Sequence, residues 1–168
     1  MACTTTLAPS TSGVARLSTR LRDAVNLGVA DAFFLALDHA HASVIRPYLG
    51  NSLALYATSQ VNVGTSPLGG RELDRVRFVD MPWLLQGDHA AVMVYPRPPF
   101  GAVFEFERLY ALGIDAFRIA LELLRHNPDA ELDGVTGRIR LTRDQHFIRE
   151  LPAAQFIDGK TVILGESR

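Results

Sequence analysis

The sequence predicts an α/β fold built on a mostly parallel sheet in a three-layer arrangement, and three observations predict it. Two short apolar runs, 31–37 and 53–57, are separated by a helical segment. A long amphipathic segment follows at 104–126. The last part of the chain, 135–164, alternates apolar and charged residues and contains two turn signals that are typical of hairpins.

The two apolar runs have no polar face, which is typical of strands buried on both sides in a parallel sheet. Asp38 follows the first run and is well placed as the N-cap of a helix that Gly50 ends. A strand, a helix and a second strand form a βαβ unit. We therefore expect the two runs to be parallel neighbours, with helix 38–49 on one face of their sheet.

The N-terminal residues 1–13 are small and polar and include proline and glycine, so we expect a disordered lead-in. From 14 to 25 the apolar residues recur at helical spacing between arginines. The length of the chain and its 48% hydrophobic content suit one sizeable core. We take 14–168 as one domain.

The middle of the chain is richer in turn-forming residues. Residues 60–74 contain Gly, Asn, Ser and Pro and are expected to form a long loop. Residues 75–79 alternate like a strand, which 80–83 end. Three prolines in 84–103 exclude an interior helix or a central strand there.

Segment 104–126 has the strongest helical pattern. The face that we expect to be buried consists of Phe106, Leu109, Tyr110, Phe117, Ala120, Leu121 and Leu124. The solvated face is expected to hold the carboxylates Glu105, Glu107, Asp115 and Glu122. Gly113 is expected to let a neighbouring backbone come close. On this basis Phe117→Ala should cost about 3–5 kcal/mol.

Two hairpins are expected in the tail. Asp144-Gln145 separates an alternating run from the apolar and charged residues 146–151. Asp158-Gly159 separates 153–157 from 160–164 and is the stronger turn signal.

Composition excludes several classes of protein. The net charge of −1 argues against a strongly basic nucleic-acid surface. Cys3 is the only cysteine, so neither an internal disulfide nor a zinc site of several cysteines can form. We find neither a membrane-spanning apolar run nor a signal peptide before Cys3, so we expect no export signal in this chain.

The polar residues do not form a catalytic pattern. His39 and His41 point to different faces of their helix and are expected to be exposed. Ser59 lacks the G-x-S-x-G context of a nucleophile, and no glycine cluster matches a phosphate loop. We therefore predict no hydrolase or transferase activity, no bound metal and no cofactor.

Ligands of open parallel sheets bind beyond the carboxyl ends of the strands. The residues at those ends are Thr58, Ser59, Gln60, Asp80 and Trp83. Together they offer donors, acceptors and an aromatic plate, which suits a small polar ligand. The alternative is that Trp83 packs under the proline-rich loop and that the polar residues cap the strand ends.

Five segments resemble the LppC/LpoA family of outer-membrane lipoproteins. They are DAFFLALDHAHASVIRPYL (31–49), LYATSQVNVG (55–64), LDRVRFVDMPWLL (73–85), FERLYALGIDAFRIALELL (106–124) and GVTGRIRLTRDQHFIRELPAAQF (134–156). YATSQ and RLYALGIDA are the more specific signatures. The GVTGRI turn is shared with the wider type I periplasmic binding proteins. The segments occur in family order and cover most of 31–156.

The resemblance implies part of a type I periplasmic-binding-protein-like domain, namely its second lobe with the C-terminal hairpins. Family members are lipid-anchored in the outer membrane, act in the periplasm, stimulate a class A penicillin-binding protein and are not enzymes. The function that we expect is therefore regulation of such a synthase. Since the first lobe is expected to be absent, apolar surface should be exposed and favour self-association.

Other functions remain open at this point. The βαβ core and the polar strand ends also fit a type I periplasmic receptor for small molecules. A remnant without a function of its own is a further alternative. An α/β enzyme is the third, which no motif favours.

Overall fold

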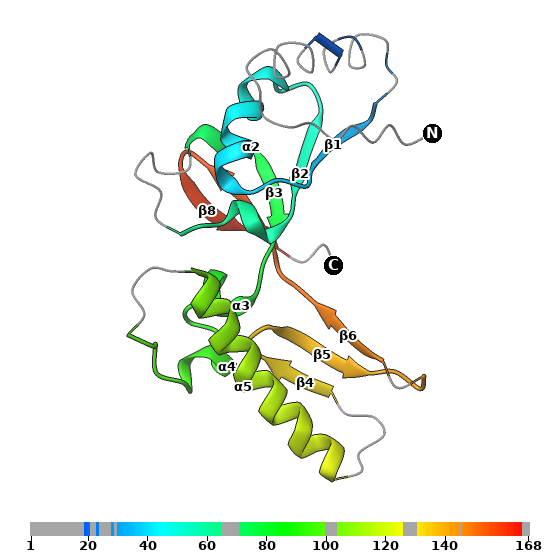
Figure 1. Ribbon diagram of the computed structural model, residues 1–168, viewed down its shortest axis with the longest axis vertical. Helices are drawn as coiled ribbons and strands as arrows, with labels where there is room; N and C mark the ends of the chain where they lie inside the picture. The colour runs from blue at the N-terminus through cyan, green and yellow to red at the C-terminus, as the bar shows by residue number, and fades with distance from the viewer. Residues whose placement is uncertain are drawn as a thin grey trace.

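The computed structural model describes residues 19–20, 23, 28, 30–64, 71–99, 104–125, 131–144 and 146–165. These residues form two bodies, each with its own sheet and its own buried cluster (Figure 1). The expected lead-in 1–13 and most of the expected helix 14–25 lie outside the described residues. The single domain proposed for 14–168 thus contains two bodies, which the sequence did not distinguish.

The sheet body contains the predicted βαβ unit. It begins with β1 (Ala32–Leu35), α2 (His39–Ile45), β2 (Ala54–Ala57) and β3 (Val76–Val79). β1 pairs with β2 and β2 with β3, both in parallel. The prediction that the two apolar runs are parallel neighbours, with the helix on one face, is confirmed.

The C-terminal hairpin completes this sheet. β7 (Ala153–Ile157) pairs antiparallel with β3, and β8 (Lys160–Ile163) pairs antiparallel with β7. The strand order is β1-β2-β3-β7-β8. Asp158 and Gly159 both have positive φ, at 50° and 78°, as the two-residue turn of a hairpin requires. The sheet is therefore mixed, with parallel strands in its first part as expected.

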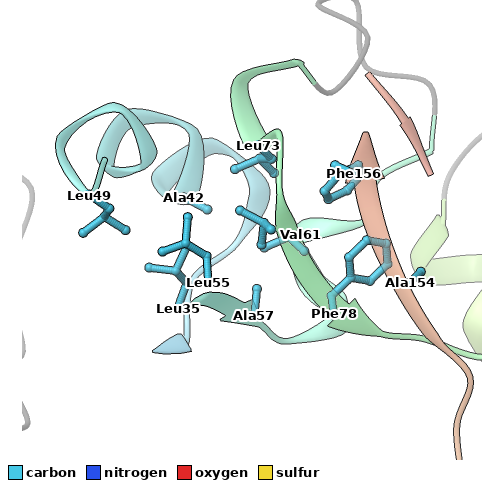
Figure 2. Close-up of a cluster of buried hydrophobic side chains, with 11 residues drawn as sticks. Leu35, Ala42, Leu49, Leu55, Ala57, Val61, Leu73, Phe78, Ala154 and Phe156 are labelled. Carbon is cyan, nitrogen blue, oxygen red and sulfur yellow. The ribbon is translucent and has the colours of Figure 1, made fainter. Parts of the chain in front are cut away.

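The core of the sheet body lies between α2 and one face of the sheet. Figure 2 shows Leu35, Leu55 and Ala57 beneath Ala42 of α2. The rings of Phe78 and Phe156 stack with centroids 4.7 Å apart. On the opposite face Phe34 and Tyr56 are exposed, so the described residues supply two of the three expected layers.

Local hydrogen bonds explain where α2 begins. The Asp38 side chain accepts from the backbone N–H of His41 at 2.9 Å, as expected of an N-cap. This bond, with the His41 side chain, lowers the pKa of the Asp38 carboxyl below its usual 3.8. His41 is exposed as expected, but His39 is not: its Nδ1 lies 2.9 Å from the Val61 carbonyl and its Nε2 2.9 Å from Glu72. The sequence did not anticipate these partners because they follow it by 22 and 33 positions.

Three short 3-10 turns accompany this body: η1 (Arg46–Tyr48), η2 (Ser59–Val61) and η3 (Arg71–Leu73). η2 and η3 fall in and beside the loop expected at 60–74. Val61 and Leu73 are fully buried, so both turns contribute to the core.

The helix body contains three helices of the described residues 82–124 and a three-stranded antiparallel sheet in the order β4-β5-β6. Its elements are α3 (Pro82–Leu85), α4 (Ala90–Met93), α5 (Phe104–Leu124), β4 (Glu131–Gly134), β5 (Gly137–Leu141) and β6 (Phe147–Glu150). The β5–β6 hairpin predicted at Asp144-Gln145 is confirmed. The expectation of no interior helix in 84–103 was wrong for α4, because its single turn ends before the first of the three prolines. No helix among the described residues is long and apolar enough to cross a membrane.

α5 matches the predicted helix, but the face expected to be buried was wrong. Phe106, Phe117 and Leu124 are 54%, 66% and 74% exposed. The other members of that face are exposed or half-buried: Leu109, Tyr110, Ala120 and Leu121. The space beside Gly113 is open, so its expected role in a close backbone approach was also wrong.

Two crossings of the chain join the bodies. Asp80 and Met81 lead from β3 into α3, and Leu151 and Pro152 lead from β6 back to β7 (Figure 1). The backbone N–H of Asp80 donates to the Pro152 carbonyl at 3.3 Å, so the crossings run side by side. The carboxyl ends of β2 and β3 lie at this junction.

Candidate functional site at the junction of the two bodies

Most of the residues predicted to bind a ligand lie at the junction. Thr58 and Ser59 are half-buried and Gln60 is exposed, all at the end of β2. Asp80, at the end of β3, is 2% exposed. The expectation that parallel strands bring their carboxyl ends together holds for these positions. Whether they bind a ligand stays a prediction.

Arg108 of α5 connects these strand ends to the helix body, and sequence reasoning missed it. Its Nη2 donates to Asp80 Oδ2 at 2.7 Å, to the Ser59 carbonyl at 2.9 Å and to the Asn62 carbonyl at 3.0 Å. The Asn62 amide also donates to Asp80 Oδ2, at 2.9 Å. The Met81 N–H donates to Asp80 Oδ1 at 2.9 Å. We call this set of contacts the Arg108 tie.

The Arg108 tie has the features of a structural ion pair. Both Asp80 oxygens have donors, so the carboxylate is compensated although it is buried. Arg108 itself is mostly buried, with 21% of its side chain exposed. Its guanidinium also lies 5.8 Å from the centre of the Phe104 ring.

Gly64 allows α5 to come close to the sheet body. Its φ is 78°, and a Cβ there would lie 2.6 Å from a carbon of the Phe104 ring. A larger residue would be strained by this positive φ and would have to displace the Phe104 ring. Gly64 thus lies in close contact with the first residue of α5, the helix that carries Arg108.

Trp83 lies apart from the other predicted site residues. It is fully buried in the helix body, where its indole N–H donates to Glu107. The Arg97 guanidinium lies 4.2 Å from the centre of its ring, and the Tyr110 ring 5.5 Å from it. This is the packing arrangement given as the alternative, with Arg97 supplied by the proline-rich segment. Glu107 was expected on the solvated face but is 8% exposed, because it accepts this bond.

Asp115 was also expected on the solvated face and is instead 1% exposed. Its Oδ2 accepts from the N–H and the hydroxyl of Thr136, both at 2.7 Å, and its Oδ1 from the Val135 N–H at 3.1 Å. A Cβ on Gly134 would meet the Asp115 carboxylate and, at 2.7 Å, the Gly137 carbonyl. The RLYALGIDA and GVTGRI signatures therefore meet at one buried carboxylate. The sequence offered one sign of this burial: Asp115 is the one charged residue between Leu109 and Phe117.

His89 of the helix body also has structural partners. His89 is the N-cap of α4 and accepts from the Ala91 N–H at 3.3 Å. Its Nε2 lies 3.6 Å from Asp133. Across the described residues, no group of three His, Cys, Asp or Glu side chains is placed to hold a metal ion.

Comparison with known sequences gives one family. Residues 10–159 match the family described as LppC putative lipoprotein. The protein named penicillin-binding protein activator LpoA from Pantoea ananatis (strain LMG 20103) is 31% identical over 144 residues, which are 80% of this chain and 21% of that protein. The protein of the same name from Yersinia pseudotuberculosis serotype O:1b (strain IP 31758) is 28% identical over 82% of this chain and 22% of its own length. This chain thus spans about a fifth of the length of these relatives.

Two solved structures share the fold. A putative branched-chain amino acid ABC transporter from Chromobacterium violaceum ATCC 12472 superposes with a TM-score of 0.72 and 44% identity, over 89% of this chain and 48% of that chain. The LpoA C-domain from Haemophilus influenzae, described as a regulator of PBP1A, superposes with a TM-score of 0.69 and 22% identity, over 90% of this chain and 49% of that one. At 22% identity the second likeness supports the fold alone.

Proposed function

This chain belongs to the LppC family of putative lipoproteins, and from that premise we propose that it is a regulator that activates a class A penicillin-binding protein in peptidoglycan synthesis. In this proposal the chain catalyses no reaction itself. It acts in the periplasm, in a protein held at the outer membrane by a lipid anchor.

The observation that carries the proposal is the match to proteins named penicillin-binding protein activators over four-fifths of this chain. Residues within the family signatures also stabilise the fold. Asp115 holds the GVTGRI turn, and Glu107 holds Trp83 of the DMPW segment. The family signatures therefore fix the shape of the chain, and a regulator acts through the shape of its binding surface.

The junction supports a regulator more than a receptor. The Arg108 tie engages the strand ends at which a receptor of this fold would bind its ligand. It also holds the two bodies together across their crossings. A surface that is already fixed loses less conformational freedom on binding a partner. A regulator of this kind acts by binding one state of its partner more tightly than another.

A binding experiment tests the proposal. The purified chain is immobilised and titrated with a detergent-solubilised class A penicillin-binding protein from the same genome. Full-length LpoA from Pantoea ananatis, titrated against the synthase of its own genome, is the positive control. We expect saturable binding that survives physiological salt. Saturation in the control but none with this chain would contradict the proposal.

One observation favours a second candidate, a receptor for a small solute. The chain is 44% identical to the Chromobacterium violaceum protein described as a putative branched-chain amino acid ABC transporter. A receptor should melt at a higher temperature in the presence of leucine, isoleucine or valine. The regulator proposal predicts no such shift. A saturable shift that is lost in Ser59→Ala would favour the receptor.

A further inference from the structure

His39 joins three elements of the sheet body through its imidazole ring. It is the first residue of α2 and is mostly buried, with 17% of its side chain exposed. Its Nδ1 lies 2.9 Å from the Val61 carbonyl oxygen of η2, and its Nε2 lies 2.9 Å from the Glu72 carboxylate of η3. The ring therefore fastens α2 to both turns that follow β2.

Both partners of the ring accept hydrogen bonds and have no proton to give. A backbone carbonyl oxygen is an acceptor only, and so is an ionised carboxylate. A neutral imidazole has one N–H and one acceptor nitrogen, so it can satisfy only one of the two contacts. The two contacts of His39 are therefore satisfied together when each ring nitrogen carries a proton, which makes the ring an imidazolium.

Among the described residues, Glu72 is the charged group in contact with this ring. The turns packed against α2 are η1, η2 and η3, and the sheet face beneath the helix is apolar. η2 contains no charged residue. The charged groups of the other elements are exposed or bonded elsewhere: Asp38 and His41, which bond to each other, Arg46, which donates to Asp74, Gly50 and Asn51, and Arg71, which is exposed. The charge on the mostly buried ring is therefore compensated by Glu72.

Loss of one ring proton breaks one of the two contacts. The bond to the Glu72 carboxylate has a charged acceptor and is the stronger, so the remaining proton stays on Nε2. Nδ1 then presents a lone pair to the Val61 carbonyl oxygen, and two acceptors 2.9 Å apart repel each other. Val61 is fully buried, so η2 has to move before this carbonyl can meet another donor.

η2 also carries two of the three oxygen atoms that accept from Arg108. They are the carbonyl oxygens of Ser59, its first residue, and of Asn62, the residue that follows its end. The Asn62 side chain also donates to Asp80 at 2.9 Å. A movement of Val61 therefore reaches the Arg108 tie through the next residue of the chain.

We propose that His39 is a pH-sensitive switch, in which loss of a ring proton displaces η2 and loosens the Arg108 tie between the two bodies. The direction follows from the contacts. The fastening is complete in mild acid, where the ring is protonated, and it is lost as the pH rises. This is the opposite sense to a carboxylate cap such as Asp38, which loses its contribution as the pH falls. The inference does not depend on the regulatory function proposed above.

Hydrogen–deuterium exchange of the full chain tests the proposal. Exchange is followed by mass spectrometry at about pH 5.5 and about pH 8.5, on either side of the ordinary histidine titration near about 6.5. Each rate is divided by the intrinsic rate at that pH, which leaves the protection due to structure. We expect protection to fall at least about fivefold at the higher pH, both at 58–64 and at 108–112 of α5.

Glu72→Gln removes the switch and keeps the contact. The glutamine amide can accept from a protonated Nε2 or donate to a neutral one, so His39 keeps both partners at either pH. We expect equal protection at the two pH values. His39→Gln has no titrating ring and should also show no dependence on pH. His41→Gln is the matched control, because His41 pairs with Asp38 on the same helix but is 52% exposed, and it should keep the fall in protection.

The variants decide between the outcomes. A fall in protection in the chain and in His41→Gln that is absent from Glu72→Gln and His39→Gln supports the switch. No fall in the chain, the same fall in either of those two variants, or its loss in His41→Gln overturns it. A fall at 58–64 with none at 108–112 overturns the link to the Arg108 tie. Circular dichroism at both pH values checks that each variant keeps its fold.

Discussion

Arg108→Met removes the cation that joins the two bodies, while the methionine keeps most of the apolar stem. Asp80, at 2% exposure, would then keep only the Asn62 amide and the Met81 N–H as donors to its side chain. Removing one partner of a buried ion pair costs about 3–5 kcal/mol. The Arg108 side chain is 21% exposed, and Asp80 keeps two donors in the variant. We therefore expect the free energy of unfolding to fall by about 3 kcal/mol, the lower end of this range.

Urea denaturation of the full chain measures this loss. Trp83 is the only tryptophan and is buried in the helix body, so its fluorescence reports that body, while circular dichroism reports both. The matched control is Arg125→Met, at the residue that follows α5. Arg125 also pairs with a carboxylate, Glu122, but its side chain is 69% exposed, so its loss should cost less than about 1 kcal/mol.

A double-mutant cycle with Asp80→Asn isolates the pair. We expect a coupling free energy of about 1–3 kcal/mol between Arg108 and Asp80, because they share one buried contact. If the losses of unfolding free energy in the two single variants add up to that of the double variant within about 0.5 kcal/mol, the Arg108–Asp80 pair contributes no coupling energy to stability. A loss of unfolding free energy below about 1 kcal/mol in Arg108→Met would likewise show that the ion pair does not stabilise the chain.

Three further predictions concern packing, backbone and pH. Phe117→Ala should cost less than about 1 kcal/mol, since the ring is exposed, whereas Phe78→Ala, at 2% exposure, should cost about 3–5 kcal/mol; urea melts of both compare them. Gly113→Ala should stabilise the chain by about 0.5–1 kcal/mol, because the space beside it is open, whereas Gly134→Ala should destabilise it through contact with a carbonyl 2.7 Å away; thermal melts give the sign of each. The lowered pKa of Asp38 means that its cap contributes stability in full above pH 3.8 and loses it as the pH falls through the lowered pKa. The stability difference between the chain and Asp38→Ala should therefore be present at pH 6 and shrink in strong acid, and a difference that grows in acid would contradict this.

Local patterns predicted much of the fold. The apolar runs at 31–37 and 53–57, with Asp38 between them and the helix, were enough to place two parallel strands and a capped helix. Asp158-Gly159 was enough to place the last hairpin. These features depend on neighbours in the sequence, and propensity and turn geometry report them directly.

The face of α5 could not be predicted in the same way. Periodicity showed that an apolar side exists, but it does not say whether that side meets the chain's own body or another polypeptide. Asp115 and Glu107 look like solvated charges in the sequence because their partners lie 20 and 24 positions away. The same limit hid Arg108, whose contacts reach back 28 to 49 positions.

The candidate site was predicted in part. The rule for strand ends placed Ser59 and Asp80 at the same edge of the sheet. In the structure the Ser59 carbonyl and the Asp80 carboxylate both accept from Arg108, a partner that the sequence did not indicate. Trp83 follows Asp80 by three positions, yet it packs inside the helix body, because the crossing between the bodies lies between them. Sequence distance alone could not show that crossing.

The regulatory role can be tested by the rate of glycan-strand synthesis by a class A penicillin-binding protein, measured with and without the purified chain. We expect a saturable increase in that rate. The increase should be smaller with Arg108→Met, which loses the contact between the two bodies, and unchanged with the Arg125→Met control. An unchanged rate at saturating chain, together with a melting temperature that leucine, isoleucine or valine raises, would contradict the regulatory role and favour the receptor.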